Sequence, residues 1–158
     1  MDGVGSILNG AIDAGATLLV VLSWHVENAN VLWDAVRAVL PSESARAILF
    51  AAPWELLDAS VVRRLVKSVQ QIDWNSDHAG ILETALMLHL APDLVGPIPT
   101  PSSGAPPPFD VLPTPASAAP VGGLINDATG ASAALGRDSF ESMVSSMARA
   151  VLGVRRDG

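Results

Sequence analysis

Cysteine is absent from this chain of 158 residues, and basic residues are scarce. The lack of cysteine excludes disulfide scaffolds, thiolate zinc sites and cysteine nucleophiles. Nine lysines and arginines stand against sixteen aspartates and glutamates, so the formal net charge is -7. This is the wrong sign for binding a phosphate backbone, and we therefore expect no nucleic-acid partner.

Long hydrophobic runs are also missing. The apolar stretch from Ala14 to Trp24 falls well short of the roughly 20 residues that a membrane-spanning helix needs. No lysine or arginine precedes Arg37, so the positive region of a signal peptide is absent too. Because 49% of the residues are hydrophobic and 16% are charged, the chain can build a real core. We expect a soluble, cytoplasmic protein with a single domain over residues 1–158 and no membrane contact.

Hydrophobic periodicity predicts helices that alternate with strands. Two continuous apolar runs, 17–22 and 45–52, are typical of parallel strands that are buried on both faces. This alternation predicts an α/β fold with three layers, α/β/α, around a mainly parallel sheet. The expected helices cover about residues 3–15, 28–40, 58–70, 78–90 and 132–152.

Proline is concentrated in one segment. Ten of the twelve prolines lie between Pro92 and Pro120, which excludes regular elements there. A disordered linker is the simplest interpretation, but Phe109, Val111 and Leu112 supply apolar anchors. We therefore expect residues 92–122 to form an extended arm over the surface of this or another subunit.

A polar cluster follows the first expected strand, where open α/β sheets bind their ligands. His25 and Glu27 lie two positions apart, so in extended backbone both side chains point the same way. An imidazole and a carboxylate on one side can bind a divalent metal. This spacing is also common by chance, and a solvent-exposed loop histidine is the alternative.

Tryptophan and histidine recur at comparable places along the chain. Trp54 follows the second expected strand, and Trp74, Asp77 and His78 lie at the start of a later helix. The arrangement predicts a polar pocket with aromatic walls. Tryptophan is also a common core residue, which is our interpretation of Trp33, and Asp77 is a good candidate for a helix N-cap.

Two stretches of the sequence resemble the creatininase family of amidohydrolases. Residues 24–28 (WHVEN) are similar to its G-H-Y-E-N strand end, with Trp24 in place of the glycine. Residues 72–88 (IDWNSDHAGILETALML) are similar to its W-x-x-[ED]-H-[AG]-G-x-x-E-T-S-L-M-L signature. The resemblance extends to the proline-rich arm at 107–113 and to the segment 123–136 before the last helix. It covers nearly the whole chain from about residue 5.

The resemblance implies a binuclear zinc or manganese centre. In this chain His25 and Glu27 match two of its protein ligands, one to each metal. The family supplies its other ligands from an E-x-H motif and an aspartate earlier in its sequence, and nothing here matches them. We therefore expect the metal site, and the sheet on its N-terminal side, to be incomplete in this chain.

The same resemblance implies the hydrolysis of creatinine, a cyclic amide, to creatine. Trp54 and Trp74 match the tryptophans that enclose the flat ring, and both together favour creatininase over its deformylase and peptidase relatives. His78 matches the histidine that protonates the departing ring nitrogen. Asp77 replaces a glutamate and can still hydrogen-bond the substrate or His78.

Three functions remain open at the level of the sequence. The first is a creatininase-type amidohydrolase that is incomplete or inactive as this chain alone. The second is a non-catalytic homologue that assembles with a complete subunit. The third is a related enzyme for another cyclic amide, a formamide or a peptide. Since the family forms homohexamers, we expect a homo-oligomer in each case.

Overall fold

The computed structural model divides the chain into two compact units, Met1–Leu57 with Met143–Gly158, and Asp58–Ser142. The single domain predicted over residues 1–158 stays a prediction. Pro92–Leu94, at the start of the expected arm, form the short 3-10 helix η3. The expectation of no regular element is therefore wrong at these residues, because proline is tolerated in the first turn of a helix. The part of the arm from residue 99 on lies outside the described residues. Those described residues are 2–40, 45–68, 78–98 and 127–156.

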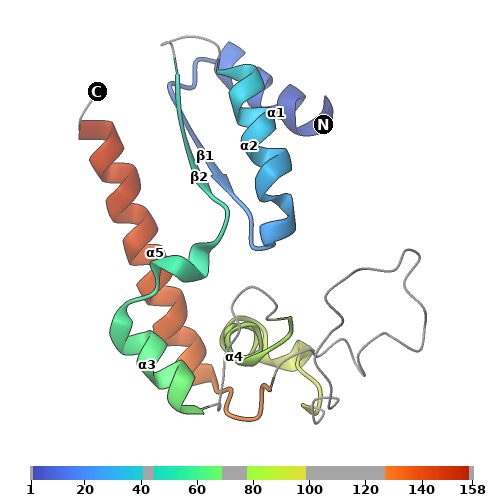
Figure 1. Ribbon diagram of the computed structural model, residues 1–158, viewed down its shortest axis with the longest axis vertical. Coiled ribbons are helices and arrows are strands. Elements are labelled where there is room, and N and C mark those ends of the chain that lie inside the picture. Colours follow the sequence, from blue (N-terminus) through green and yellow to red (C-terminus); the bar gives the residue numbers. More distant parts are fainter. Residues whose placement is uncertain (1, 41–44, 69–77, 99–126, 157–158) are drawn as a thin grey trace. The chain divides into compact units, whose positions relative to one another are not determined.

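The first unit is built on a parallel pair of strands, β1 (Leu18–Leu22) and β2 (Arg46–Phe50). Leu18 pairs with Arg46 and Leu22 with Phe50, so the two strands run in step and end together. Helix α2 (Ala29–Val39) lies between them in the sequence (Figure 1). A crossover helix of this kind is what two neighbouring parallel strands require. The predicted α/β class with a parallel sheet is confirmed.

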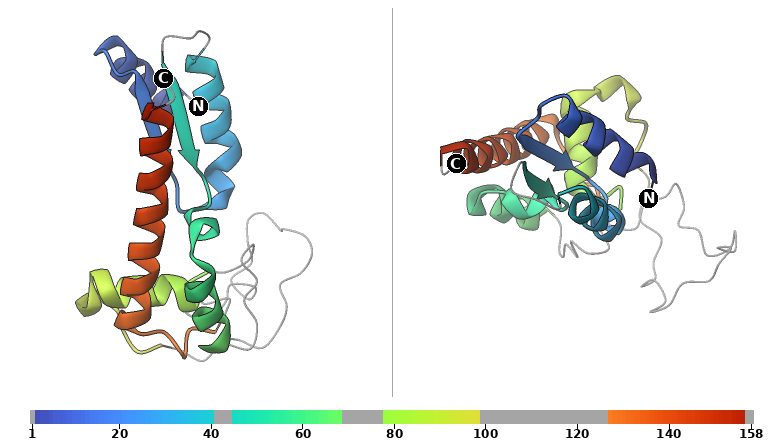
Figure 2. Two further views of the ribbon diagram at one scale, coloured as in Figure 1. Left: turned by 90° about the vertical axis from the view of Figure 1, so that its left-hand side faces the viewer. Right: turned by 90° about the horizontal axis from the view of Figure 1, so that it is seen from above.

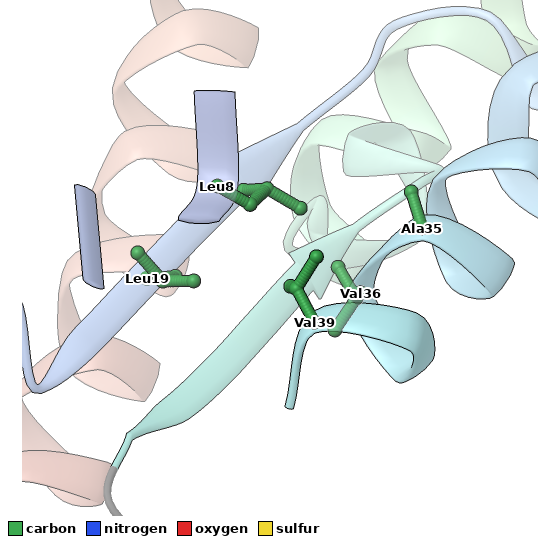
Figure 3. Close-up of a cluster of buried hydrophobic side chains, with 5 residues drawn as sticks. All are labelled: Leu8, Leu19, Ala35, Val36 and Val39. Carbon is green, nitrogen blue, oxygen red and sulfur yellow. The ribbon is translucent and has the colours of Figure 1, made fainter. Parts of the chain in front are cut away.

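The core of the first unit lies on one face of this sheet. Helix α1 (Asp2–Asp13) and α2 both cover that face, as two further directions of view show (Figure 2). Gly15 follows α1 with a φ of 94°, a conformation that glycine adopts without strain, and turns the chain into β1. The cluster of buried side chains is contributed by α1, β1 and α2 (Figure 3): Leu8, Leu19, Ala35, Val36 and Val39.

The opposite face of β1 is much less buried than the sequence predicts. Successive side chains of a strand point to opposite faces. Leu19 enters the core, so Val20 and Leu22, one and three positions later, point to the other face. Val20 is 50% exposed and Leu22 is 57% exposed, so the prediction that both faces of β1 are buried is wrong. Trp33 is 53% exposed as well, because it lies outside the buried stripe of α2, and its predicted place in the core is also wrong.

The second unit is helical. It contains α3 (Ala59–Ser68), α4 (Ile81–Leu90) and the first residues of α5 (Ala133–Arg156), up to Ser142. The backbone N–H of Asp58 donates to Ser142 Oγ over 2.8 Å, and Arg64 forms an ion pair with Asp138. No helix in the described ranges is long and apolar enough to cross a membrane. All three helices contribute large apolar side chains to the core of the unit, among them Val61, Leu65, Ile81, Leu82, Leu86 and Leu135.

Helix α5 begins with a well-defined cap. The Thr129 hydroxyl and backbone N–H both donate to Asp127 Oδ1, and these bonds hold the pKa of Asp127 below its ordinary value. Ser132 Oγ then accepts the N–H of Leu135 over 3.2 Å, which is the role of a helix N-cap. The last helix therefore starts at residue 133, within a residue of its predicted start.

Candidate functional site

The carboxyl ends of β1 and β2 lie at the same end of the sheet, and the buried Ser23 forms hydrogen bonds to the residues around it. The Ser23 N–H donates to the Phe50 carbonyl over 2.9 Å, and its Oγ donates to the His25 carbonyl over 3.1 Å. The same Oγ accepts a hydrogen bond from Asn28 Nδ2 over 3.3 Å. Asn28 is the N-cap residue of α2, but its side chain makes no cap hydrogen bond. The polar groups of this loop thus fix the backbone on either side of the His25 side chain.

His25 and Glu27 come together by a different route from the one predicted. Residues Val26–Asn28 form a 3-10 turn, η1, so the backbone between the two side chains is not extended. His25 Nδ1 nevertheless lies 3.9 Å from Glu27 Oε2, with the side chains 58% and 76% exposed. An exposed pair at this distance contributes little to stability. The pair is therefore of interest as two potential metal ligands and not as a stabilising contact.

The pair suits a divalent metal in donor type but not in donor number. Imidazole nitrogen and carboxylate oxygen both bind zinc or manganese. A zinc site in a protein takes at least three protein ligands. Within residues 2–40, 45–68, 78–98 and 127–156, no three His, Cys, Asp or Glu side chains are grouped closely enough to hold a metal. These residues therefore supply two ligands, and the others would have to come from elsewhere.

Two tryptophans meet at the same edge of the sheet. Trp54 lies in η2 (Pro53–Leu56), directly after β2, and is half-buried. The Trp24 ring packs edge-on against it, with ring centroids 5.5 Å apart and an interplanar angle of 69°. This contact was not predicted from the sequence. One feature of the sequence could have predicted it: Trp24 and Trp54 each follow one of the two expected strands, and the carboxyl ends of neighbouring parallel strands lie at the same side of a sheet.

His78 lies in the second unit, in the bend that leads into α4. The expected helix over 78–90 begins later, at Ile81, because Ala79 has a φ of 53° and cannot belong to a right-handed helix. His78 is exposed. Trp74 and Asp77, the other two residues predicted for this part of the site, lie outside the described residues. His25, Glu27 and Trp54 belong to the first unit.

Comparison with known proteins decides the family. The model of the Creatininase family, described as creatinine amidohydrolase, matches residues 1–151. The chain belongs to the creatininase family. It is 28% identical over 145 residues to the creatinine amidohydrolase of Pseudomonas putida, an alignment that covers 87% of this chain and 55% of that protein.

Solved creatininases share the fold of this chain. A crystal structure of creatinine amidohydrolase superposes with a TM-score of 0.82 at 27% identity, covering 94% of this chain and 60% of that one. A mutant creatininase complexed with creatine has a TM-score of 0.80 at 26% identity, with 94% and 61% covered. Other solved creatininases are a manganese form and a mutant of Zn-Zn type. The chain spans less than two thirds of the length of these relatives.

Proposed function

We propose that this chain is a metal-dependent amidohydrolase of the creatininase type, which opens the cyclic amide of creatinine to creatine. The observation that carries the proposal is the His25–Glu27 pair, with 3.9 Å between Nδ1 and Oε2, which follows β1 as the half-buried Trp54 follows the neighbouring parallel strand β2. In an α/β sheet this edge is where ligands bind. The relatives that are a manganese form, a Zn-Zn form and a creatine complex support the same chemistry.

His25 and Glu27 each contribute one ligand in this proposal. The two residues would help to hold a binuclear zinc or manganese centre, one residue to each metal, and that centre would supply a Lewis acid for the amide carbonyl and lower the pKa of water. Ser23 and Asn28 bond the His25 carbonyl and each other, which fixes the backbone that carries the imidazole. Trp54 offers a flat apolar surface to the ring of the substrate, and Trp74 has the same proposed role.

His78 moves the proton. Hydrolysis joins a water oxygen to the carbonyl carbon and breaks the bond from that carbon to the ring nitrogen, which must gain a proton as it leaves. An imidazole within hydrogen-bond reach of that nitrogen is the usual group for this transfer. We assign it to His78, with Asp77 as a hydrogen-bonding partner of the substrate or of the imidazole.

A second candidate is a non-catalytic homologue that assembles with a complete subunit. The number of metal ligands favours this candidate, because the residues that the structure describes bring together fewer ligands than a zinc site needs. Both candidates predict the same fold. They differ in whether the purified chain retains metal and turns over substrate.

The test is to load the purified chain with Zn²⁺ or Mn²⁺, remove free metal, and measure bound metal by mass spectrometry together with creatine formation from creatinine. We expect metal-dependent turnover. His25→Ala and Glu27→Gln should each weaken metal binding by about tenfold or more, whereas the exposed Glu55→Gln, next to Trp54, should not. His78→Ala should lower kcat by about 100-fold and leave the bound metal unchanged.

Each other result has a definite meaning. Retained metal without turnover would favour the non-catalytic homologue. No retained metal, or equal retention in the His25→Ala, Glu27→Gln and Glu55→Gln variants, would contradict the proposed ligand roles.

A further inference from the structure

The turn His78-Ala79-Gly80 has a backbone that an alanine seldom adopts. Ala79 has a φ of 53° and is the one non-glycine residue with positive φ in the described part of the chain. For a residue with a β-carbon, this left-handed conformation is disfavoured, because the β-carbon comes too close to the following carbonyl oxygen. Such a conformation persists only where surrounding groups hold it.

Two side chains from the first turn of α4 hold Ala79. Glu83 Oε2 accepts the Ala79 N–H over 2.6 Å, and Thr84 Oγ1 donates to the Ala79 carbonyl over 3.0 Å. Both backbone polar groups of this one residue are therefore bound by α4. The helix itself starts with a separate bond, from the Thr84 N–H to the Gly80 carbonyl over 2.9 Å.

These bonds act on His78 through the peptide plane. The six atoms from one Cα to the next are coplanar, so the Ala79 N–H lies in the same plane as the Cα of His78. Holding that N–H against Glu83 fixes the position of the His78 Cα relative to α4. Thr84 fixes the next plane, and the two bonds together fix both backbone angles of Ala79.

The helix that carries this clamp is itself well anchored. Ile81 is 1% exposed and Leu82 is 2% exposed, so the first turn of α4 is packed into the core of its unit. The two bonding side chains, Glu83 and Thr84, therefore form a clamp on a rigid helix. Groups carried by a rigid element hold their partners more precisely than groups carried by a loop.

We propose that Glu83 and Thr84 are positioning residues, which hold His78 in place for the proton transfer to the leaving nitrogen. This rests on the proposed function, since it needs His78 to handle that proton. A displacement of about 1 Å at a reacting group can cost about 100-fold in rate. The clamp should therefore appear in kcat and much less in KM.

The experiment compares pairs of variants in the full chain, loaded with Zn²⁺ or Mn²⁺ and supplied with creatinine. Glu83→Ala and Thr84→Val remove the bonding groups, whereas Glu83→Gln and Thr84→Ser keep an acceptor oxygen and a hydroxyl. We expect kcat to fall by about 10- to 100-fold in the first pair, with KM within about twofold, and to recover most of its value in the second pair. Glu141→Ala, which removes an exposed glutamate of α5, is the charge control and should leave kcat unchanged.

Amide hydrogen exchange provides a readout that does not depend on activity. In Glu83→Ala the Ala79 amide should exchange at least tenfold faster, whereas the Thr84 amide, which bonds to Gly80, should stay protected. Loss of protection at both amides would show that Glu83 only starts the helix, and would overturn the positioning role.

The kinetic outcomes separate the two proposals. Turnover in the wild-type chain with an unchanged kcat in Glu83→Ala would overturn the positioning role alone. A wild-type chain that retains metal but has no turnover would overturn the proposed function, and with it the positioning role.

Discussion

Trp24 and Trp33 show how two identical side chains of one unit differ in what they contribute. The Trp24 ring is half-buried and packs edge-on against Trp54, whereas Trp33 is 53% exposed on α2. An edge-to-face aromatic pair contributes about 0.5–1.5 kcal/mol beyond the area that it buries. The two positions therefore form a matched test of the contact at the edge of the sheet.

Trp24→Ala should lower the free energy of unfolding by about 1–2 kcal/mol and remove much of the near-UV circular dichroism that a rigid Trp–Trp pair produces. Trp54→Ala should remove the same signal, and the two substitutions should not be additive, because they break one contact. Trp33→Ala should change the stability by less than about 0.5 kcal/mol. Equal effects of Trp24→Ala and Trp33→Ala on the urea midpoint and the spectrum would contradict the pairing.

Single residues of the site were predictable where chemistry is local in the sequence. The spacing of His25 and Glu27 predicted an extended backbone with both side chains on one side. The side chains do lie 3.9 Å apart, but through a 3-10 turn, and their role as metal ligands stays a prediction. The clamp on Ala79 was not predictable from periodicity, because hydrophobic patterns locate helices but do not specify a positive φ. The contact of Trp24 with Trp54 depends on how two strands end in space, which no local pattern contains.

Elements were the most predictable level of this fold. The strands lie within the predicted runs, and the predicted helix starts are within a few residues of those observed. The main deviation is α4, which begins at Ile81 because a left-handed residue precedes it. Patterns of apolar residues indicate where helices and strands form. They do not record how closely two helix backbones approach.

Gly136 on α5 marks such an approach. A β-carbon added there would lie 1.8 Å from the Ala85 carbonyl oxygen and 2.4 Å from its carbon, so no rotamer change can relieve the clash. Gly136→Ala should cost at least about 2 kcal/mol of unfolding free energy, as overpacking of helix contacts does. Urea denaturation followed by far-UV circular dichroism measures this change.

The same helix offers the control. Nothing lies within 4 Å of a β-carbon placed on Gly153, so Gly153→Ala should stabilise α5 by up to about 1 kcal/mol through helix propensity alone. Ala85→Gly should not rescue Gly136→Ala, because the clash involves the main chain of Ala85. A neutral Gly136→Ala would show that α4 and α5 do not approach this closely.

At the scale of the whole molecule, the sheet is thin for an α/β protein. In the described part of the chain β1 pairs with β2 and with no other strand, so one edge of β1 presents unpaired backbone groups. The face of β1 away from α1 and α2 presents Val20 and Leu22, 50% and 57% exposed. The class of fold was predictable from strand and helix alternation, but the cover of this face was not, because a continuous apolar run does not say what packs against it.

An open edge beside an apolar face favours association between copies of a chain. We therefore expect the purified chain to be poorly soluble, or to be oligomeric when its molar mass is measured by multi-angle light scattering. Val20→Lys places a charge on that face, and lysine is a residue with which natural edge strands resist pairing. It should lower the scattering mass or raise the solubility limit severalfold.

Ile7→Lys is the matched control for this last prediction. Ile7 is 74% exposed on α1, so its replacement removes an apolar side chain and adds the same charge without touching the sheet. Each substitution changes the net charge from -7 to -6, so if net charge alone governs solubility, both variants will change it equally, and the role of β1 is then refuted. If the exposed apolar face of β1 governs the solubility, only Val20→Lys will raise it. A wild-type chain that is a monodisperse monomer at high concentration would contradict the prediction before any variant is made.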